Sequence, residues 1–462
     1  MSTKNSEENS SGNQNRRITW EGCSVLLDIN DGDRVLFARL TAGSKVKIGD
    51  KNCSLQPLIG RPFGSSFQVE VGADGPVLSQ IIPNAEGNNL GEKMDDQTME
   101  ECRDNRALVD NNTAQSLTGE DIDDMRRKGA TGDDIVQALI ANSATFEKKT
   151  AFSQEKYRIK KQKKYAPRVL LRRPLARSIC EAYFKKHAEK IGYLRVDTLS
   201  LLLSMANVTA HSDVLVFDML EGLVTGAVAE RLGGMGYVCN PYCGTTPYPV
   251  SIVRMFNLSD ETCKRIVHAR LTELQPSNSG NSTSTDQLVD ACNITEQKNE
   301  NTVSPSPAVD LVNMEESSSG NMETDTNVAA FPKSGNSVKA GKSEDAHREV
   351  IESWKENGFS SLIIAAPNMD AWDIAKELVP LLSYSAPFVI YHQYLEPLAT
   401  CMHNLQSKKM AINLQISEPW LREYQVLPSR THPHMQMSSS GGYLLSGTRI
   451  SSNDQAPINT NL

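Results

Sequence analysis

Residues 214–226 read Val214-Leu215-Val216-Phe217-Asp218-Met219-Leu220-Glu221-Gly222-Leu223-Val224-Thr225-Gly226, an apolar run that leads into a turn and a helix. A strand, turn and helix of this kind bind a nucleotide-like ligand when glycines let the backbone approach it and the helix N-terminus faces it. Here Leu220 and Val224 stand where a Gly-x-Gly-x-Gly loop would need bare backbone, with Gly222 between them. We therefore expect side chains to fill the ligand's space and this degenerate loop to bind no cofactor.

The acidic residues of this loop have two interpretations. Asp218 ends the apolar run and Glu221 follows closely, so either could be the remnant of a ligand site. A carboxylate here can equally supply negative charge at a helix N-terminus or be solvated. We favour this second interpretation, because an isolated remnant of a motif is weak support for a site.

The composition is typical of a soluble intracellular protein with several domains. A chain of 462 residues is long enough for roughly two or three domains, each with its own core. It contains no run of about 20 apolar residues, so we expect no transmembrane helix, and its first residues lack the apolar core of a signal peptide. Its nine cysteines are an odd number without framework spacing, which fits a reducing compartment.

The patterning predicts an N-terminal β domain, a linker and a C-terminal α/β domain. Alternating runs between residues 18 and 82 predict a small antiparallel barrel or sandwich, and short apolar strands alternating with helices from Ser212 onwards predict a sheet covered on both faces. One expected helix begins at Ser259 and runs to Leu274. The predicted segments are a β domain at 18–105, a helical basic linker at 106–173, an α/β domain at 174–275 and 343–450, and disordered polar segments at 1–17, 276–342 and 451–462.

Two helices of the linker have recognisable starts. Thr118 with Asp121, and Thr131 with Asp134, have the spacing of N-caps supported by an acid in the first turn. A third helix is expected to begin at Ser153 and to end before Pro167.

The third helix and the residues after it carry a concentrated positive charge. Nine basic residues and no acid lie between Lys156 and Arg173, although the whole chain has a net charge of −8. Neutralising a phosphate backbone turns the repulsion between such side chains into attraction, so we favour nucleic-acid binding. The candidate contact residues are Lys148, Lys149, Lys156, Arg158, Lys160, Lys161, Lys163, Lys164, Arg168, Arg172 and Arg173.

Other interpretations of this basic segment remain open. It could be a solvated helix whose lysine stems cover apolar surface, or a nuclear-localisation signal. The neighbouring aromatic residues Phe152, Tyr157 and Tyr165 could pack against the helix or stack on unpaired bases.

Four ordered blocks of sequence resemble a known family. They are residues 143–157 with their following lysines, Arg195-Val196-Asp197-Thr198-Leu199, residues 231–236 and residues 424–433; the ending at 441–447 is also similar. These blocks resemble the non-catalytic subunits of the eukaryotic tRNA (adenine(58)-N1)-methyltransferase, and the similarity covers most of residues 18–450 outside the insertion.

The resemblance implies a fold, an assembly and a task. It implies a Rossmann-like methyltransferase fold with a degenerate cofactor site, and a heterotetramer with two copies each of this chain and a catalytic partner. That assembly methylates N1 of an adenosine in the T-loop of tRNA, in the nucleus, with S-adenosylmethionine bound by the partner. The present chain would supply tRNA-binding surface and architecture.

Two further departures from an active methyltransferase follow from this comparison. Such enzymes place an acid after the second strand to hold the cofactor ribose, whereas residues 237–242 contain no carboxylate and present Asn240. The resemblance also implies an Asp that engages the target adenine at the end of a later strand, where this chain has Ala365. We therefore expect no catalytic residue in this chain.

The sequence also bears on metal binding and on rival functions. Cys239 and Cys243 have a loose metal-like spacing, but a structural zinc needs four ligands and no second pair lies close by, so we expect no metal. The rival functions are an active RNA methyltransferase with a divergent pocket, an interaction protein such as a translation-factor scaffold, and a structural stabiliser of a partner. No association with a membrane is expected.

Overall fold

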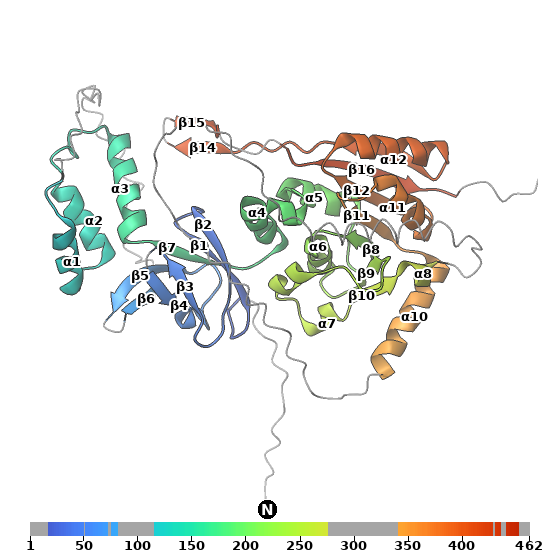
Figure 1. The fold of residues 1–462 in the computed structure, drawn as a ribbon, viewed down its shortest axis with the longest axis horizontal. Coiled ribbons are helices and arrows are strands. Elements are labelled where there is room, and N and C mark those ends of the chain that lie inside the picture. The colour runs from blue at the N-terminus through green and yellow to red at the C-terminus, as the bar shows by residue number, and fades with distance from the viewer. Residues whose placement is uncertain are drawn as a thin grey trace, which may run out of the picture. The chain divides into compact units, whose positions relative to one another are not determined.

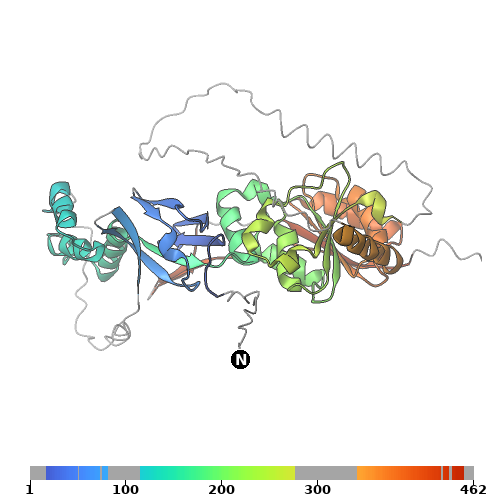
Figure 2. The same ribbon diagram turned by 90° about the horizontal axis from the view of Figure 1, so that it is seen from below.

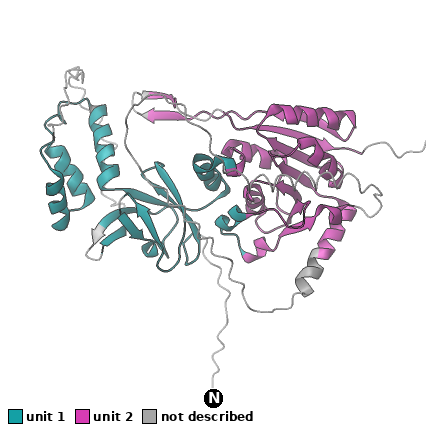
Figure 3. Cartoon of the chain, viewed as in Figure 1, with its two compact units in different colours: residues 1–189, 251–259 teal, residues 190–250, 260–462 magenta. Residues whose placement is uncertain are grey.

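The computed structural model describes residues 17–49, 51–72, 75–81, 115–275, 341–427, 430–435 and 440–451. The chain forms two compact units (Figure 3): unit 1 comprises Met1–Glu189 and Ser251–Ser259, and unit 2 comprises Lys190–Val250 and Asp260–Leu462. The predicted disordered segments 1–17, 276–342 and 451–462 lie almost entirely outside the described residues, as do residues 82–114 of the predicted β domain and linker.

Unit 1 contains a five-stranded antiparallel sheet in the order β2-β1-β7-β5-β6 and a separate pair, β3 and β4. Strand β1 is buried along nearly its whole length, and Val25 and Leu27 pack with Phe67 in the core of this unit. The antiparallel β domain expected from the alternating sequence is therefore present. Its strands are β1 (Ser24–Ile29), β2 (Arg34–Arg39), β3 (Lys45–Ile48), β4 (Lys51–Ser54), β5 (Ser66–Gly72), β6 (Gly75–Gln80) and β7 (Arg168–Arg172).

Strand β7 was not expected, because residues 168–173 were assigned to the helical linker. It pairs with β1 on one side and β5 on the other, so the end of the predicted linker lies at the centre of the sheet. Val169 and Leu171 are fully buried while Arg168 is exposed. This alternation is a strand pattern. The residues of β1 and β5 that pair with β7 all lie a hundred or more residues earlier in the chain.

The α-helices in the described part of unit 1 are α1 (Gly119–Arg127), α2 (Gly132–Ala141), α3 (Ala151–Tyr165) and α4 (Ala176–Lys186). The predicted caps are confirmed, since Thr118 and Asp121 form a capping box at α1 and Thr131 and Asp134 form one at α2. Helices α1, α2 and α3 lie together in both views (Figures 1 and 2), and Tyr165 of α3 packs against the small core of α1 and α2.

Unit 2 contains a seven-stranded sheet in the order β10-β9-β8-β11-β12-β16-β13. All neighbours from β10 to β12 are parallel, and β16 is antiparallel to both of its neighbours. This is the sheet of a Rossmann-like methyltransferase fold, which confirms the predicted α/β class. The strands are β8 (Asp213–Asp218), β9 (Tyr237–Tyr242), β10 (Ile266–Arg270), β11 (Ser361–Ala365), β12 (Pro387–His392), β13 (Ala411–Ser417) and β16 (Tyr443–Arg449).

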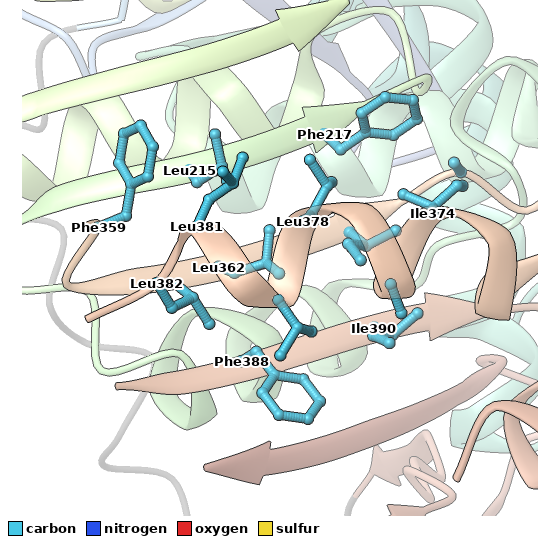
Figure 4. Packing of buried hydrophobic residues seen from close by; sticks show 14 of the residues in the cluster. Leu215, Phe217, Phe359, Leu362, Ile374, Leu378, Leu381, Leu382, Phe388 and Ile390 are labelled. Carbon is cyan, nitrogen blue, oxygen red and sulfur yellow. The ribbon is translucent and has the colours of Figure 1, made fainter. Parts of the chain in front are cut away.

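Helices cover both faces of this sheet. On one face, Leu215 and Leu362 of the strands pack against Ile374 and Leu378 of α11 (Figure 4). The other face carries α5 and α6. The helices of unit 2 include α5 (Val196–Met205), α6 (Leu223–Leu232), α10 (Gly341–Asn357), α11 (Ala371–Leu378) and α12 (Leu395–Ser407).

The single helix expected from Ser259 to Leu274 is wrong. The structure has a short helix α7 (Asp260–Cys263), strand β10 and a short helix α8 (Leu271–Leu274). Val267 and Ala269 are buried in β10, which pairs with β9. The boundary at residue 174 also differs, because α4 and Ser251–Ser259 belong to unit 1.

Candidate functional site: a filled crevice and a basic helix

The loop between β8 and α6 lies where the strand order of the sheet reverses. Strand β8 has β9 on one side and β11 on the other, and ligands of open α/β sheets bind in the crevice outside the carboxyl ends of the strands at such a point. Asp218 ends β8 and Gly222 is the N-cap of α6, with a φ of 83°. Residues 218–225 therefore occupy the position of a cofactor loop.

Asp218 holds this loop together from the inside. Its carboxylate accepts hydrogen bonds from the backbone N–H of Leu220 and Thr225, each 2.8 Å long, and from the Thr225 hydroxyl at 2.9 Å. Burial raises the pKa of the fully buried Asp218, and these hydrogen bonds oppose that effect. Because Thr225 is in the first turn of α6, this geometry supports the interpretation of Asp218 as a charge at a helix N-terminus. The Asp218 side chain is buried and therefore not solvated.

Leu220 is packed against the chain itself. It is 1% exposed, and a Cβ placed on Gly192 would meet Leu220 Cδ2 at 2.9 Å and Pro367 Cγ at 2.7 Å. The side of Gly192 that a Cβ would occupy is therefore covered by Leu220 and by Pro367, which lies just after β11. The space beside the loop is filled with apolar side chains.

The glycine that remains in the loop is also covered. A Cβ on Gly222 would lie 2.7 Å from Val250 Cα, so its bare backbone faces another part of the chain. Val224 is completely buried in α6. Leu220, Gly222 and Val224 thus leave no glycine surface for the close approach that a nucleotide-like ligand needs.

The other two expected departures lie at neighbouring strands. Asn240 is buried in β9, and its amide donates a 3.2 Å hydrogen bond to the Thr225 hydroxyl, which in turn donates to Asp218. Its Oδ1 has no hydrogen-bond partner among the residues that the structure describes. Ala365, at the end of β11, is fully buried and accepts a backbone hydrogen bond from Met219. Neither position offers a carboxylate to a ligand.

Several residues that complete the crevice were not anticipated from the sequence. Gly192, Val250 and Pro367 cover the loop, and the Tyr391 hydroxyl donates a 2.8 Å hydrogen bond to the Gly192 carbonyl. Glycine and proline are typical of loops, but nothing in their spacing indicates that they meet Leu220. Burial lowers the pKa of nearby His392, so this side chain favours its neutral form.

The basic residues proposed to contact RNA all lie in unit 1, in three consecutive segments of the chain. Lys148 and Lys149 precede α3, and the candidates from Lys156 to Lys164 lie on α3. Arg168 and Arg172 lie on β7, and Arg173 follows it. The basic residues of α3 are therefore only part of the candidate set.

Two of the candidates are engaged within unit 1. Lys163 forms a 2.7 Å ion pair with Asp33, and Arg172 pairs with Asp28 at 3.2 Å and with Glu181 at 3.7 Å. The sequence of the basic segment could not reveal these ion pairs, because their acidic partners lie in other parts of the chain. These two side chains therefore already have carboxylate partners.

The aromatic residues of α3 pack inside unit 1. The Tyr157 ring makes an edge contact with Phe146, and the ammonium groups of Lys149 and Lys161 lie 5.0 and 5.2 Å from its centroid. Lys164 lies 5.2 Å from the centroid of Tyr165, which is part of the helical core. Packing is therefore the role of Tyr157 and Tyr165, whereas Phe152 is 41% exposed.

The remaining lysines present their charge to solvent. Lys148, Lys156 and Lys160 are exposed, and none of them has an ion pair with another described residue. Arg158 is also exposed, with a 3.8 Å contact to exposed Glu155. The solvent-facing part of the basic segment consequently centres on Lys156 and Lys160 of α3, and we call these two residues with Lys148 the exposed lysine group.

Metal sites and membrane-spanning helices are two further classes of feature. Among the described residues, no group of three or more His, Cys, Asp or Glu side chains is arranged to hold a metal ion. No helix in the described part of the chain combines the length and the apolar character that crossing a membrane requires.

The fold and the crevice define a methyltransferase-like protein whose cofactor loop is closed by its own side chains. The chain belongs to the Gcd10p family, which it matches over residues 19–315. It is 35% identical to the tRNA (adenine(58)-N(1))-methyltransferase non-catalytic subunit trm6 of Dictyostelium discoideum, over 94% of this chain and 80% of that protein. It is 31% identical to the protein of the same description from Mus musculus, over 91% of this chain and 88% of that protein.

Among solved structures, the tRNA (m1A58) methyltransferase TrmI of Aquifex aeolicus is similar. The TM-score is 0.44 at 11% sequence identity, with 94% of this chain and 99% of that chain covered.

Proposed function

We propose that this chain is the non-catalytic, tRNA-binding subunit of a tRNA (adenine(58)-N(1))-methyltransferase. The observation that carries the proposal is the filled crevice: Leu220 is buried against Gly192 and Pro367, where a cofactor would need bare backbone. The names of the relatives support the same role. S-adenosylmethionine is then bound by a catalytic partner, and this chain binds no cofactor.

The second part of the proposal concerns tRNA. The exposed lysine group supplies sequence-independent attraction to phosphates through counterion release, and folded RNA is recognised mainly by its shape and backbone. This chain holds the tRNA while the target base is flipped into the partner's pocket. The assembly contains two copies of each subunit and acts in the nucleus.

The experiment compares methyl transfer and tRNA binding by this chain alone and with its co-purified catalytic partner. We expect N1-methyladenosine to form only when the partner is present. The double variant Lys156→Glu with Lys160→Glu should weaken tRNA binding by more than about tenfold and flatten its salt dependence. The matched control is Lys190→Glu with Lys264→Glu, which makes the same charge change at exposed lysines of unit 2.

Each rival predicts a different outcome. Methyl transfer by the purified chain alone would identify an active methyltransferase with a divergent pocket. Unchanged tRNA affinity in the α3 variant, with the complex still formed, would favour a structural stabiliser. Failure to co-purify with any methyltransferase would favour an unrelated interaction protein.

A further inference from the structure

A hollow lies at the amino-terminal edge of the parallel strands of unit 2, whereas the filled crevice lies at their carboxyl edge. It is formed where α10 ends, where the chain approaches β12 and where β16 ends. Its volume is about 270 Å³, just below the usual range of small-molecule sites, so a ligand bound there would stay partly exposed. Its lining includes Trp354, Gly358, Leu382, Ser383, Tyr384 and Arg449.

Backbone hydrogen bonds fix the walls of the hollow. Ser383 N–H donates to the Phe359 carbonyl at 2.8 Å, and Arg449 N–H donates to the Ala386 carbonyl at 3.0 Å. Gly358 has a φ of 72°, and a Cβ there would lie 2.6 Å from the Ser383 nitrogen. The three chain segments are thus tied together, so the hollow is present without any rearrangement.

Arg449 and Tyr384 form the recognition surface of the hollow. The Arg449 guanidinium lies 4.8 Å from the centroid of the Tyr384 ring, and Tyr384 is 65% exposed. Arg449 is half-buried, and burial lowers its pKa. No carboxylate among the described residues pairs with it, in contrast to Lys355 on the rim, which contacts Glu352 at 3.3 Å. An anion would compensate this partly desolvated charge.

Trp354, one of the residues that line the hollow, also carries a buried donor without a partner. Trp354 is 3% exposed, and its Nε1 has no hydrogen-bond partner among the described residues. Its ring is held between Tyr237 and Phe359, at centroid distances of 6.0 and 4.9 Å. An unpaired buried N–H is rare and calls for an acceptor.

We propose that this hollow binds a nucleotide, whose base stacks on Tyr384 and whose phosphate pairs with Arg449. Stacking on an exposed aromatic ring beside an arginine is a sequence-tolerant way to hold an unpaired base, and the guanidinium matches a phosphate in a bidentate manner. An acidic peptide would use Arg449 but would make no use of the exposed Tyr384 ring. The nucleotide is either free or an unpaired residue of an RNA, and the second source rests on the proposed tRNA-binding function.

The test uses the full-length chain with two probes, AMP and a short unstructured RNA oligonucleotide. Binding of each is measured by titration, and the contact is located by ultraviolet crosslinking followed by mass spectrometry. We expect the crosslink at Tyr384, and we expect Tyr384→Ala and Arg449→Gln each to weaken binding about tenfold. Tyr384→Phe, which keeps the ring, should bind normally. Arg265→Gln is the matched control, because Arg265 lies 4.6 Å from the centroid of Tyr237 and does not line the hollow.

The outcomes separate the sources and the two proposals. Binding of AMP that depends on Tyr384 and Arg449 supports a free nucleotide, and binding of the oligonucleotide alone supports RNA. If both probes bind equally well to the two variants, or if neither binds, the nucleotide site is overturned. RNA binding that falls with the α3 double variant but not with Tyr384→Ala would leave the proposed function intact and contradict this inference. Circular dichroism of each variant confirms that it is folded.

Discussion

The crevice beside Leu220 and helix α3 use their polar groups in opposite ways. In the crevice, Asp218 and its hydrogen-bonded neighbours are turned inward and bond to one another, with Asn240 Oδ1 left without a partner among the described residues. On α3, Lys156 and Lys160 are exposed without an ion pair to any described residue. Internal pairing of the first group serves stability, whereas unpaired charge contributes little to stability and is available to a partner. The comparison teaches that the polar groups of the crevice are used within the fold, whereas charges on α3 remain available to a partner.

Truncating Leu220 tests whether the crevice is filled. Leu220→Ala should lower the free energy of unfolding by about 2–5 kcal/mol, because it opens a cavity against Gly192 and Pro367. Leu201→Ala on α5, where the side chain is 37% exposed, should cost less than about 1 kcal/mol. Urea unfolding monitored by circular dichroism measures both, and equal small losses would mean that Leu220 is not packed.

Removing the Thr225 hydroxyl tests the inward-facing network. Thr225→Val deletes its hydrogen bonds to Asp218 and Asn240 and should cost about 1–3 kcal/mol, because both partners are buried. Thr209→Val, at an exposed hydroxyl that contacts Ser212, should change the same unfolding free energy by less than about 0.5 kcal/mol. If Thr225→Val lowers the free energy of unfolding no more than Thr209→Val does, the network does not stabilise the fold.

Neutralising two lysines of α3 one at a time sharpens the surface side of the comparison. Lys160→Gln should weaken tRNA binding several-fold and reduce the salt slope by about 1, because it removes one phosphate contact. Lys163→Gln should affect binding less, since Lys163 is engaged by Asp33 at 2.7 Å. Titrations over a range of salt concentrations distinguish the two. The reverse order would show that the ion pair opens to bind RNA.

The smallest expected effect concerns pH. Burial lowers the pKa of His392, so the unfolded chain takes up the proton first as pH falls. The stability that depends on neutral His392 is therefore present above about pH 6.5, the ordinary value, and is lost as pH falls through the lower pKa of the folded protein. His392→Gln should show a smaller drop in melting temperature on acidification than the native chain. His403→Gln, at an exposed position, is the control, and identical pH profiles for all three proteins would contradict the expectation.

The sequence predicted best what depends on neighbouring residues. The capping pairs at Thr118 and Thr131 and the extent of α3 follow from local spacing, and the missing glycines around Leu220 indicated a closed loop. Strands β7 and β10 were missed because pairing with β1, β5 or β9 decides them. Basic residues obscured the alternation in β7, and β10 is only half-buried.

Long-range contacts explain the rest of the difference. No local pattern places Gly192, Pro367 and Val250 around the loop, because they meet only through the fold. The same holds for Lys163, whose partner Asp33 lies in another element. Counting charges along the chain therefore does not show which lysines have a carboxylate partner in the fold.

Equilibrium dialysis of the full-length chain, purified without a catalytic partner, against labelled S-adenosylmethionine tests the central claim most directly. A chain whose crevice is filled by Leu220 retains no more of the methyl donor than the buffer compartment does. Saturable retention at micromolar concentrations would contradict the account.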